Sequence, residues 1–366
     1  MIVSIVSLIG VVGLIIVVFM YLSPQFGGTP SKDEIAHYKK SDNYKSGNFV
    51  NTNAINLNMS FKDISKILIN YFKKQPNTIP VKQLTVNKID SLNLVNYKGD
   101  SRLIWFGHST FLLQLNKKTI LIDPMFGDVP APHSILGTKR FSNELPIDVE
   151  KLPRIDAVLI SHDHYDHLDY GSIQGLKDKV TMFYVPLGLG VHLKKWGIDK
   201  KRIIELDWWQ EIKFDDLTFI CTPAQHFSGR GFTDRTKTLW SSWIIQSATE
   251  NIFFSGDSGY APHFKEIGNK YGPFDFAMME CGQYNEMWPD VHMFPEETVQ
   301  AGLDIGAKKL IPIHWGAFKL AMHSWTDPVE RITLKAKSVN MPIVTPKIGE
   351  VMLVNATTLQ ATMWWK

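Results

Sequence analysis

From about residue 100 onward, the chain alternates short apolar runs with polar turns. We expect strands at LIWF (103–106), TFLLQL (110–115) and TILID (119–123), the last two joined by a turn at residues 116–118. Further strands are predicted at 155–160, 182–185, 217–222, 239–246, 251–257, 274–279 and 309–313. Helical patterns interleave with them around 187–196, 263–271, 295–305 and 326–337. Strands that alternate with helices predict a layered α/β domain, with sheets inside and helices outside.

The N-terminus carries an uninterrupted apolar run without a charged side chain, from Met1 to Leu22. As a helix rising about 1.5 Å per residue, it would span about 30 Å, the thickness of a bilayer's hydrocarbon core. A cleaved signal peptide would need a basic start, a shorter apolar stretch and a small-residue cleavage site, and none is evident. We therefore expect a retained transmembrane anchor. Lysines follow this span and none precedes it, which favours a cytoplasmic catalytic domain.

Residues 23–60 are rich in Ser, Asn, Gly and Pro, which predicts an extended tether with little helix. The next segment, FKDISKILINYFKK (61–74), places apolar side chains on one face of a predicted amphipathic helix. That helix either packs on the domain or rests on lipid headgroups. We thus expect an anchor at 1–22, a tether and N-terminal arm at 23–99, and a catalytic domain at 100–366.

Composition excludes several classes of protein. The 366 residues are 44% hydrophobic and 20% charged, as in folded globular proteins. A net charge of only +3 gives no support to nucleic-acid binding through bulk electrostatics. The two cysteines, Cys221 and Cys281, lie far apart and outside any CxxC pattern, which excludes a disulfide framework and argues against a cysteine zinc site.

One short segment, ISHDHYDHLDY (160–170), concentrates three histidines and three aspartates directly after an apolar strand. His162 and His164 alternate along an extended loop and can therefore converge on one metal ion. Asp166 and His167 follow where the chain turns and can face a second ion. Four ligands cannot complete two coordination shells, so the remaining ligands must come from other strand ends.

Three further candidates follow apolar strands: His226 after LTFICTPAQ, Asp257 at the end of NIFFSGD and His314 at the end of KLIPI. If Asp257 bridges, each ion has four protein ligands. One ion is expected to bind His162, His164, His226 and Asp257, and the other Asp166, His167, His314 and Asp257. Nitrogen and oxygen ligands without sulfur suit zinc best, with iron or manganese as alternatives.

The H-x-H-x-D-H pattern followed by a distant His, Asp and His resembles the metallo-β-lactamase superfamily, which implies an αββα sandwich with a dinuclear metal site. Longer stretches resemble the N-acylphosphatidylethanolamine-hydrolysing phospholipase D family over roughly residues 100–350. These stretches are WFGHST (105–110), LIDPMFG (121–127), GTKRF (137–141), LPRIDAVLISHDHYDHLDY (152–170), VPLGL (185–189), ELDWW (205–209), TPAQH (222–226), SGDSGY (255–260), IGNKYGPFD (267–275) and IHWGAF (313–318). The family's metal ligands carry over to the same seven residues.

The resemblance implies cleavage of the phosphodiester of N-acylated phosphatidylethanolamine, with release of N-acylethanolamine and phosphatidic acid. We expect a hydroxide held by the two ions to attack phosphorus, and Asp257 and Asp166 to be catalytic through the metals. His108 and His292 are expected to contact the substrate phosphate or to orient a ligand, and Asp123 to accept a hydrogen bond from a ligand histidine. The segment ECGQYNEMWPDVH (280–292) is shorter than in the mammalian enzymes.

The expected partners are therefore membrane phospholipid and the bilayer, without nucleic acid, and family members can pair as homodimers. The apolar N-terminus resembles that of bacterial relatives and is absent from the mammalian members. One alternative is a dinuclear lactonase or other esterase of the same fold that acts on a small phosphorylated sugar. A second is a non-enzymatic binding module that kept the fold, although the intact set of ligands argues against it.

Overall fold

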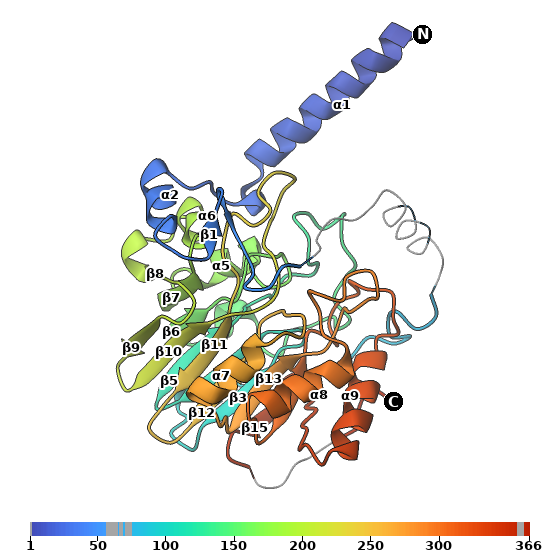
Figure 1. The fold of residues 1–366 in the computed structure, drawn as a ribbon. Helices are drawn as coiled ribbons and strands as arrows, with labels where there is room; N and C mark the ends of the chain where they lie inside the picture. Colours follow the sequence, from blue (N-terminus) through green and yellow to red (C-terminus); the bar gives the residue numbers. More distant parts are fainter. Residues whose placement is uncertain (1, 56–64, 66–68, 70–74, 357–361) are drawn as a thin grey trace.

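The computed structural model describes residues 2–55, 65, 69, 75–356 and 362–366 (Figure 1). Two sheets lie face to face, and helices cover their outer faces, so the predicted αββα sandwich is confirmed. The predicted amphipathic helix over 61–74 lies outside the described residues, apart from Ser65 and Ile69.

The first sheet has seven strands among the described residues, antiparallel at one edge and parallel at the other. In spatial order they are β15 (Val351–Leu353), β3 (Arg102–Trp105), β4 (Phe111–Leu115), β5 (Lys118–Ile122), β6 (Ile155–Leu159), β7 (Val180–Pro186) and β8 (Ile203–Leu206). Helices α4 (Ser91–Val95), α5 (Tyr170–Leu176) and α6 (Gly190–Lys195) belong to this half of the sandwich, since each has at least one buried residue in the core cluster on the outer side of the sheet.

The second sheet has six strands among the described residues. In spatial order they are β14 (Leu310–Ile313), β13 (Phe276–Glu280), β12 (Asn251–Phe254), β11 (Ser242–Gln246), β10 (Leu217–Thr222) and β9 (Glu211–Phe214). Its helices are α7 (His263–Tyr271), α8 (Pro295–Asp304) and α9 (Asp327–Ser338), which the sequence predicted at nearly the same bounds. Strands β10, β12 and β14 run in the same direction, because β11 is antiparallel to both of its neighbours.

The core explains why the strands of the first sheet are continuous apolar runs. Along β3, Leu103 and Trp105 pack in the large cluster between the two sheets. Ile104 packs on the outer side of the sheet, in a second cluster that includes Leu176 of α5 and Leu193 of α6. The sheet is therefore covered on both faces, which calls for apolar side chains at successive positions and not only at alternate ones.

The N-terminal segment differs from the predicted tether. It contains the short helix α2 (Lys32–Tyr38), whose N-terminus is closed by a capping box in which the Ser31 hydroxyl accepts from the Glu34 N–H and the Glu34 carboxylate accepts from the Ser31 N–H. A two-stranded hairpin of β1 (Tyr44–Lys45) and β2 (Asn48–Phe49) follows. Tyr38 and Phe49 are buried in the main core, so this segment packs on the domain.

Residues Ile2–Leu22 form the helix α1, which projects from the body of the protein (Figure 1). Several side chains of α1 lie outside the described part of the chain, and among the described residues no helix is both long and apolar enough to cross a membrane. The predicted transmembrane anchor is therefore not supported by the structure.

Candidate metal centre

The predicted ligands lie where strands of both sheets end. His162, His164, Asp166 and His167 occupy the loop after β6, in the first sheet. His226, Asp257 and His314 follow β10, β12 and β14, whose common direction brings their ends to one edge of the second sheet. The two edges adjoin, so side chains far apart in sequence meet.

The structure brings one predicted set of four together: His162, His164, His226 and Asp257. The Nε2 atom of His162 lies 2.9 Å from Nδ1 of His164, and Nε2 of His226 lies 3.2 Å from the same Nδ1. Oδ2 of Asp257 lies 3.7 Å from Nε2 of His162. Three imidazoles and one carboxylate therefore converge on one point.

A second group of four adjoins the first and contains Asp166, His167 and His314, as predicted, together with His108. Oδ2 of Asp166 lies 2.8 Å from Nε2 of His108, 3.5 Å from Nε2 of His167 and 3.9 Å from Nε2 of His314. His108 was expected to contact the substrate phosphate or to orient a ligand, and it lies against the Asp166 carboxylate.

Asp257 touches both groups. Its Oδ2 atom lies 3.1 Å from Nε2 of His167 in the second group and 3.8 Å from Nε2 of His226 in the first. Its Oδ1 atom lies 3.1 Å from Nδ1 of His314. A carboxylate in this position could help to hold two cations, one in each group.

Buried polar atoms without partners show that this donor set suits a cation. Nε2 of His167 and Oδ1 of Asp257 are buried and have no partner in hydrogen-bond geometry among the described residues, although each lies 3.1 Å from another group of the centre. A buried polar atom of this kind destabilises the folded protein unless an ion or a hydrogen-bond partner contacts it. The donors are imidazole nitrogens and carboxylate oxygens, and both cysteines are buried and free elsewhere, so the residues fit zinc.

Electrostatics favour the same interpretation. Burial holds the pKa values of His162, His226 and His314 well below the usual range, which keeps these rings neutral as metal binding requires. Burial opposes ionisation of Asp257, but the His167 charge outweighs it and holds the Asp257 pKa well below its usual range. Burial also opposes protonation of His167, whose pKa is nevertheless raised by Asp257 and Asp166. These carboxylates attract a metal cation as they attract the proton.

Hydrogen bonds outside the two groups orient the ligands. As predicted, Asp123 accepts a hydrogen bond from a ligand candidate: its Oδ2 lies 2.6 Å from Nδ1 of His167. Asp123 also accepts from the Ser161 N–H at 2.7 Å. The Nδ1 atom of His226 donates to the Val291 carbonyl at 3.0 Å. In His167 and in His226, the hydrogen bond at Nδ1 leaves the Nε2 atom of the ring facing the centre.

His292 lies at the side of the centre and forms a third chelating group with Asp257 and His314. Its ring stacks on His314 with centroids 5.2 Å apart, and its Nδ1 atom lies 3.4 Å from Oε1 of Glu280. Glu280 was not among the predicted site residues; it is fully buried at the end of β13, and burial raises its pKa to about 7. A charged residue that ends the apolar run FDFAMM was the available signal.

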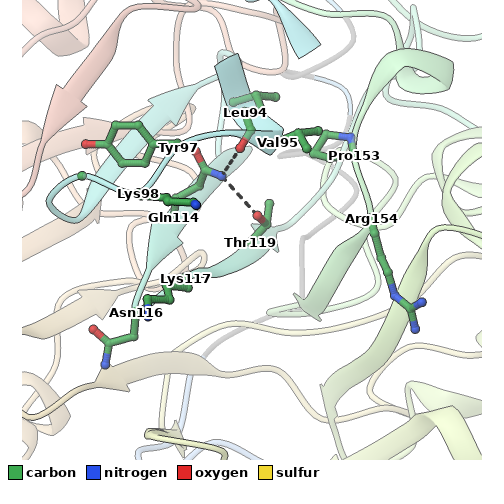
Figure 2. A pocket seen from close by; sticks show the side chains of 11 residues that line it. Leu94, Val95, Tyr97, Lys98, Gln114, Asn116, Lys117, Thr119, Pro153 and Arg154 are labelled. Carbon is green, nitrogen blue, oxygen red and sulfur yellow. Dashed lines mark hydrogen bonds between the residues drawn. The ribbon is translucent and has the colours of Figure 1, made fainter. Parts of the chain in front are cut away.

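A cavity of about 260 Å³ lies elsewhere in the fold, among other residues (Figure 2). Lys98, Lys117 and Arg154 line it, and the Gln114 amide in it donates to Thr119 Oγ1 at 3.2 Å. Its lining and the chelating groups have no described residue in common.

Comparisons with known proteins agree with this geometry. The family model of the Beta-lactamase superfamily domain matches residues 118–315. An uncharacterized protein of Mycobacterium tuberculosis is 40% identical over 90% of this chain and 88% of its own length. N-acyl-phosphatidylethanolamine-hydrolyzing phospholipase D 1 of Caenorhabditis elegans is 33% identical over 67% of this chain and 70% of its own length.

Among solved structures, the isothiocyanate hydrolase from Delia radicum gut bacteria superposes with a TM-score of 0.55 at 21% identity. The match covers 69% of this chain and 98% of that protein, and at this identity it shows the fold alone. The matched domain, the sandwich and the two chelating groups lead to one conclusion: the chain belongs to the metallo-β-lactamase superfamily and is a metal-dependent hydrolase.

Proposed function

We propose that this chain is a zinc-dependent phosphodiester hydrolase that acts on membrane phospholipid, in the manner of an N-acylphosphatidylethanolamine-hydrolysing phospholipase D. The observation that carries the proposal is the pair of chelating groups that meet at Asp257. The substrate class is supported by the similarity to the C. elegans phospholipase D.

In this proposal His162, His164, His226 and Asp257 hold one zinc ion, and Asp166, His167, His314 and Asp257 hold the other. When bound, a pair of zinc ions supplies a water-derived nucleophile at neutral pH and positive charge for the phosphate oxygens. His108 holds the Asp166 carboxylate in place through the 2.8 Å contact at Oδ2.

In this proposal His292 acts on the substrate itself. Burial opposes its protonation, but the neighbouring Glu280 carboxylate outweighs burial and raises the pKa of His292. Because Nδ1 faces Glu280 at 3.4 Å, Nε2 is the nitrogen left to hold a proton for the substrate. In the reaction, water oxygen bonds to phosphorus, the bond from phosphorus to the ethanolamine oxygen breaks, and that oxygen takes up a proton.

The test is hydrolysis of N-acylphosphatidylethanolamine in mixed micelles by zinc-loaded protein in ¹⁸O-labelled water. The proposal predicts N-acylethanolamine and phosphatidic acid as products, with the label in the phosphate of phosphatidic acid. Label in the ethanolamine alcohol would contradict attack at phosphorus. Inactivity on this lipid together with hydrolysis of a phosphorylated sugar lactone would contradict the proposed substrate and would remain consistent with the proposed metal centre.

A further inference from the structure

Residues 24–51, a part of the predicted segment 23–99 that is here called the arm, lie outside the matched family domain but contact helix α6 and the loop that carries the candidate ligand His226. We propose that this arm is part of the metal centre and that Asn51 is a positioning residue for His226. The inference rests on the proposed metal site and is independent of the identity of the substrate.

The Asn51 side chain pairs with both backbone groups of His226, a residue 175 positions away. Its Nδ2 donates to the His226 carbonyl at 2.8 Å, and its Oδ1 accepts from the His226 N–H at 3.1 Å. Oδ1 also accepts from Nε1 of Trp240 at 2.9 Å. A side-chain amide supplies one donor and one acceptor at this spacing, so it fixes the peptide groups on both sides of His226.

The His226 ring is held separately, because its Nδ1 bonds to the Val291 carbonyl at 3.0 Å. With backbone and ring both fixed, Nε2 is kept 3.2 Å from Nδ1 of His164 and 3.8 Å from Oδ2 of Asp257. Loss of the Asn51 contacts releases one of the two restraints. The loss of affinity should fall on the ion that His226 binds, because none of the proposed ligands of the other ion lies on the loop of His226.

Through His192, the arm is also linked to the H-x-H segment. The Gly28 N–H donates to Nδ1 of His192 at 3.1 Å, and Nε2 of His192 lies 3.2 Å from Oδ2 of Asp163. Asp163 stands between His162 and His164 in the sequence. A side chain on Gly28 would lie 2.4 Å from the Val191 carbonyl oxygen, so the close approach of the arm to α6 requires glycine.

Other contacts hold the arm without touching a candidate ligand. Nδ2 of Asn43 donates to Oδ1 of Asp207 at 3.0 Å, and Lys237 Nζ donates to the Gly47 carbonyl at 2.8 Å. Asn43 therefore offers a matched control, because it is an asparagine of the same arm with a long-range contact elsewhere in the fold.

The experiment titrates zinc into metal-free full-length protein against a competing chelator, for wild type, Asn51→Ala, Asn51→Asp and Asn43→Ala. We expect Asn51→Ala to bind one of two zinc ions about 10–100-fold more weakly and the other normally, because partners that orient a ligand contribute on this scale. Asn51→Asp should also weaken binding of that ion, because the second carboxylate oxygen of the new side chain would face the His226 carbonyl, where Nδ2 of Asn51 now donates a hydrogen bond. Asn43→Ala should bind both ions as the wild type does.

Thermal unfolding of the metal-free variants separates positioning from general stability. The inference predicts that saturating zinc restores turnover to Asn51→Ala. Wild-type affinity for both ions in Asn51→Ala would overturn it, as would an equal loss of zinc affinity in Asn43→Ala. If the wild type binds two ions as described and leaves N-acylphosphatidylethanolamine intact, the substrate proposal fails and the role of Asn51 stands.

Discussion

Asp257 and His167 meet where the two chelating groups adjoin, with Oδ2 of Asp257 3.1 Å from Nε2 of His167. Nε2 of His167 and Oδ1 of Asp257 are both buried, and neither atom makes a hydrogen bond within the described part of the chain. A carboxylate shared by two chelating groups, close to an imidazole nitrogen that has no partner in hydrogen-bond geometry, is the arrangement expected of a bridging ligand in a two-metal site.

Asp257→Asn should therefore lower kcat by about 100-fold or more, as loss of charge stabilisation at a reacting centre does. Asp275→Asn is the matched control, because Asp275 accepts from the Asn251 N–H at 2.9 Å at the start of β12, the strand that Asp257 follows. Steady-state kinetics with phospholipid substrate measure the effect. Substantial residual activity in Asp257→Asn would rule out the bridging role.

Asp123→Asn should weaken zinc binding by about 10–100-fold, because it disturbs the hydrogen bond that orients His167. Asp156→Asn serves for comparison, since Asp156 accepts from the Thr119 N–H at 2.8 Å in the same sheet and belongs to neither chelating group. Zinc affinities measured by chelator competition should separate the two variants. Equal affinities would show that the contact to His167 is dispensable.

Glu280 should make stability depend on pH. Burial raises its pKa from the ordinary 4.5 to about 7, so between these values the folded protein binds more protons than the unfolded chain. The free energy of unfolding therefore falls as pH rises through this range. Glu280→Gln should reduce this decrease in unfolding free energy. Chemical denaturation of both proteins at about pH 5 and at about pH 7.5 measures the decrease. An unchanged pH dependence would contradict a carboxyl that titrates in this range.

Removal of metal should abolish activity and lower the melting temperature. A ligand present at about 1,000 times its Kd stabilises the folded state by about 4 kcal/mol, so chelation should lower Tm by several degrees. Zinc should restore both properties, whereas magnesium should not, because the donors are mostly imidazoles. Calorimetry and activity after dialysis against a chelator provide the measurement. Full activity without metal would contradict the account.

Local patterns predicted much of the fold. Helix α7 occupies 263–271 as predicted, because its apolar residues recur on one face, and Pro295 begins α8. The short helices α2 and α5 were missed: each has seven residues and too few turns for a clear periodicity. Strands β8 and β9 were also missed, since most of their side chains are half-buried or exposed and give a weak apolar signal.

The chelating groups could be predicted because their members follow apolar strands, and strand ends meet at the edge of a sheet. Asn51 could not be found in this way, whereas Glu280 carried the strand-end signal but gave no sign of its burial. Asn51 reaches His226 across 175 residues, from a segment whose composition suggested a tether. Glu280 differs from an ordinary surface glutamate only through burial, which depends on how β13 is covered.

Native mass spectrometry of purified wild type and Asp257→Asn can count the zinc ions on each folded chain. We expect two zinc ions on the wild type and loss of at least one from Asp257→Asn. A fully active wild type that holds a single ion, or none, would contradict a dinuclear centre shared through Asp257.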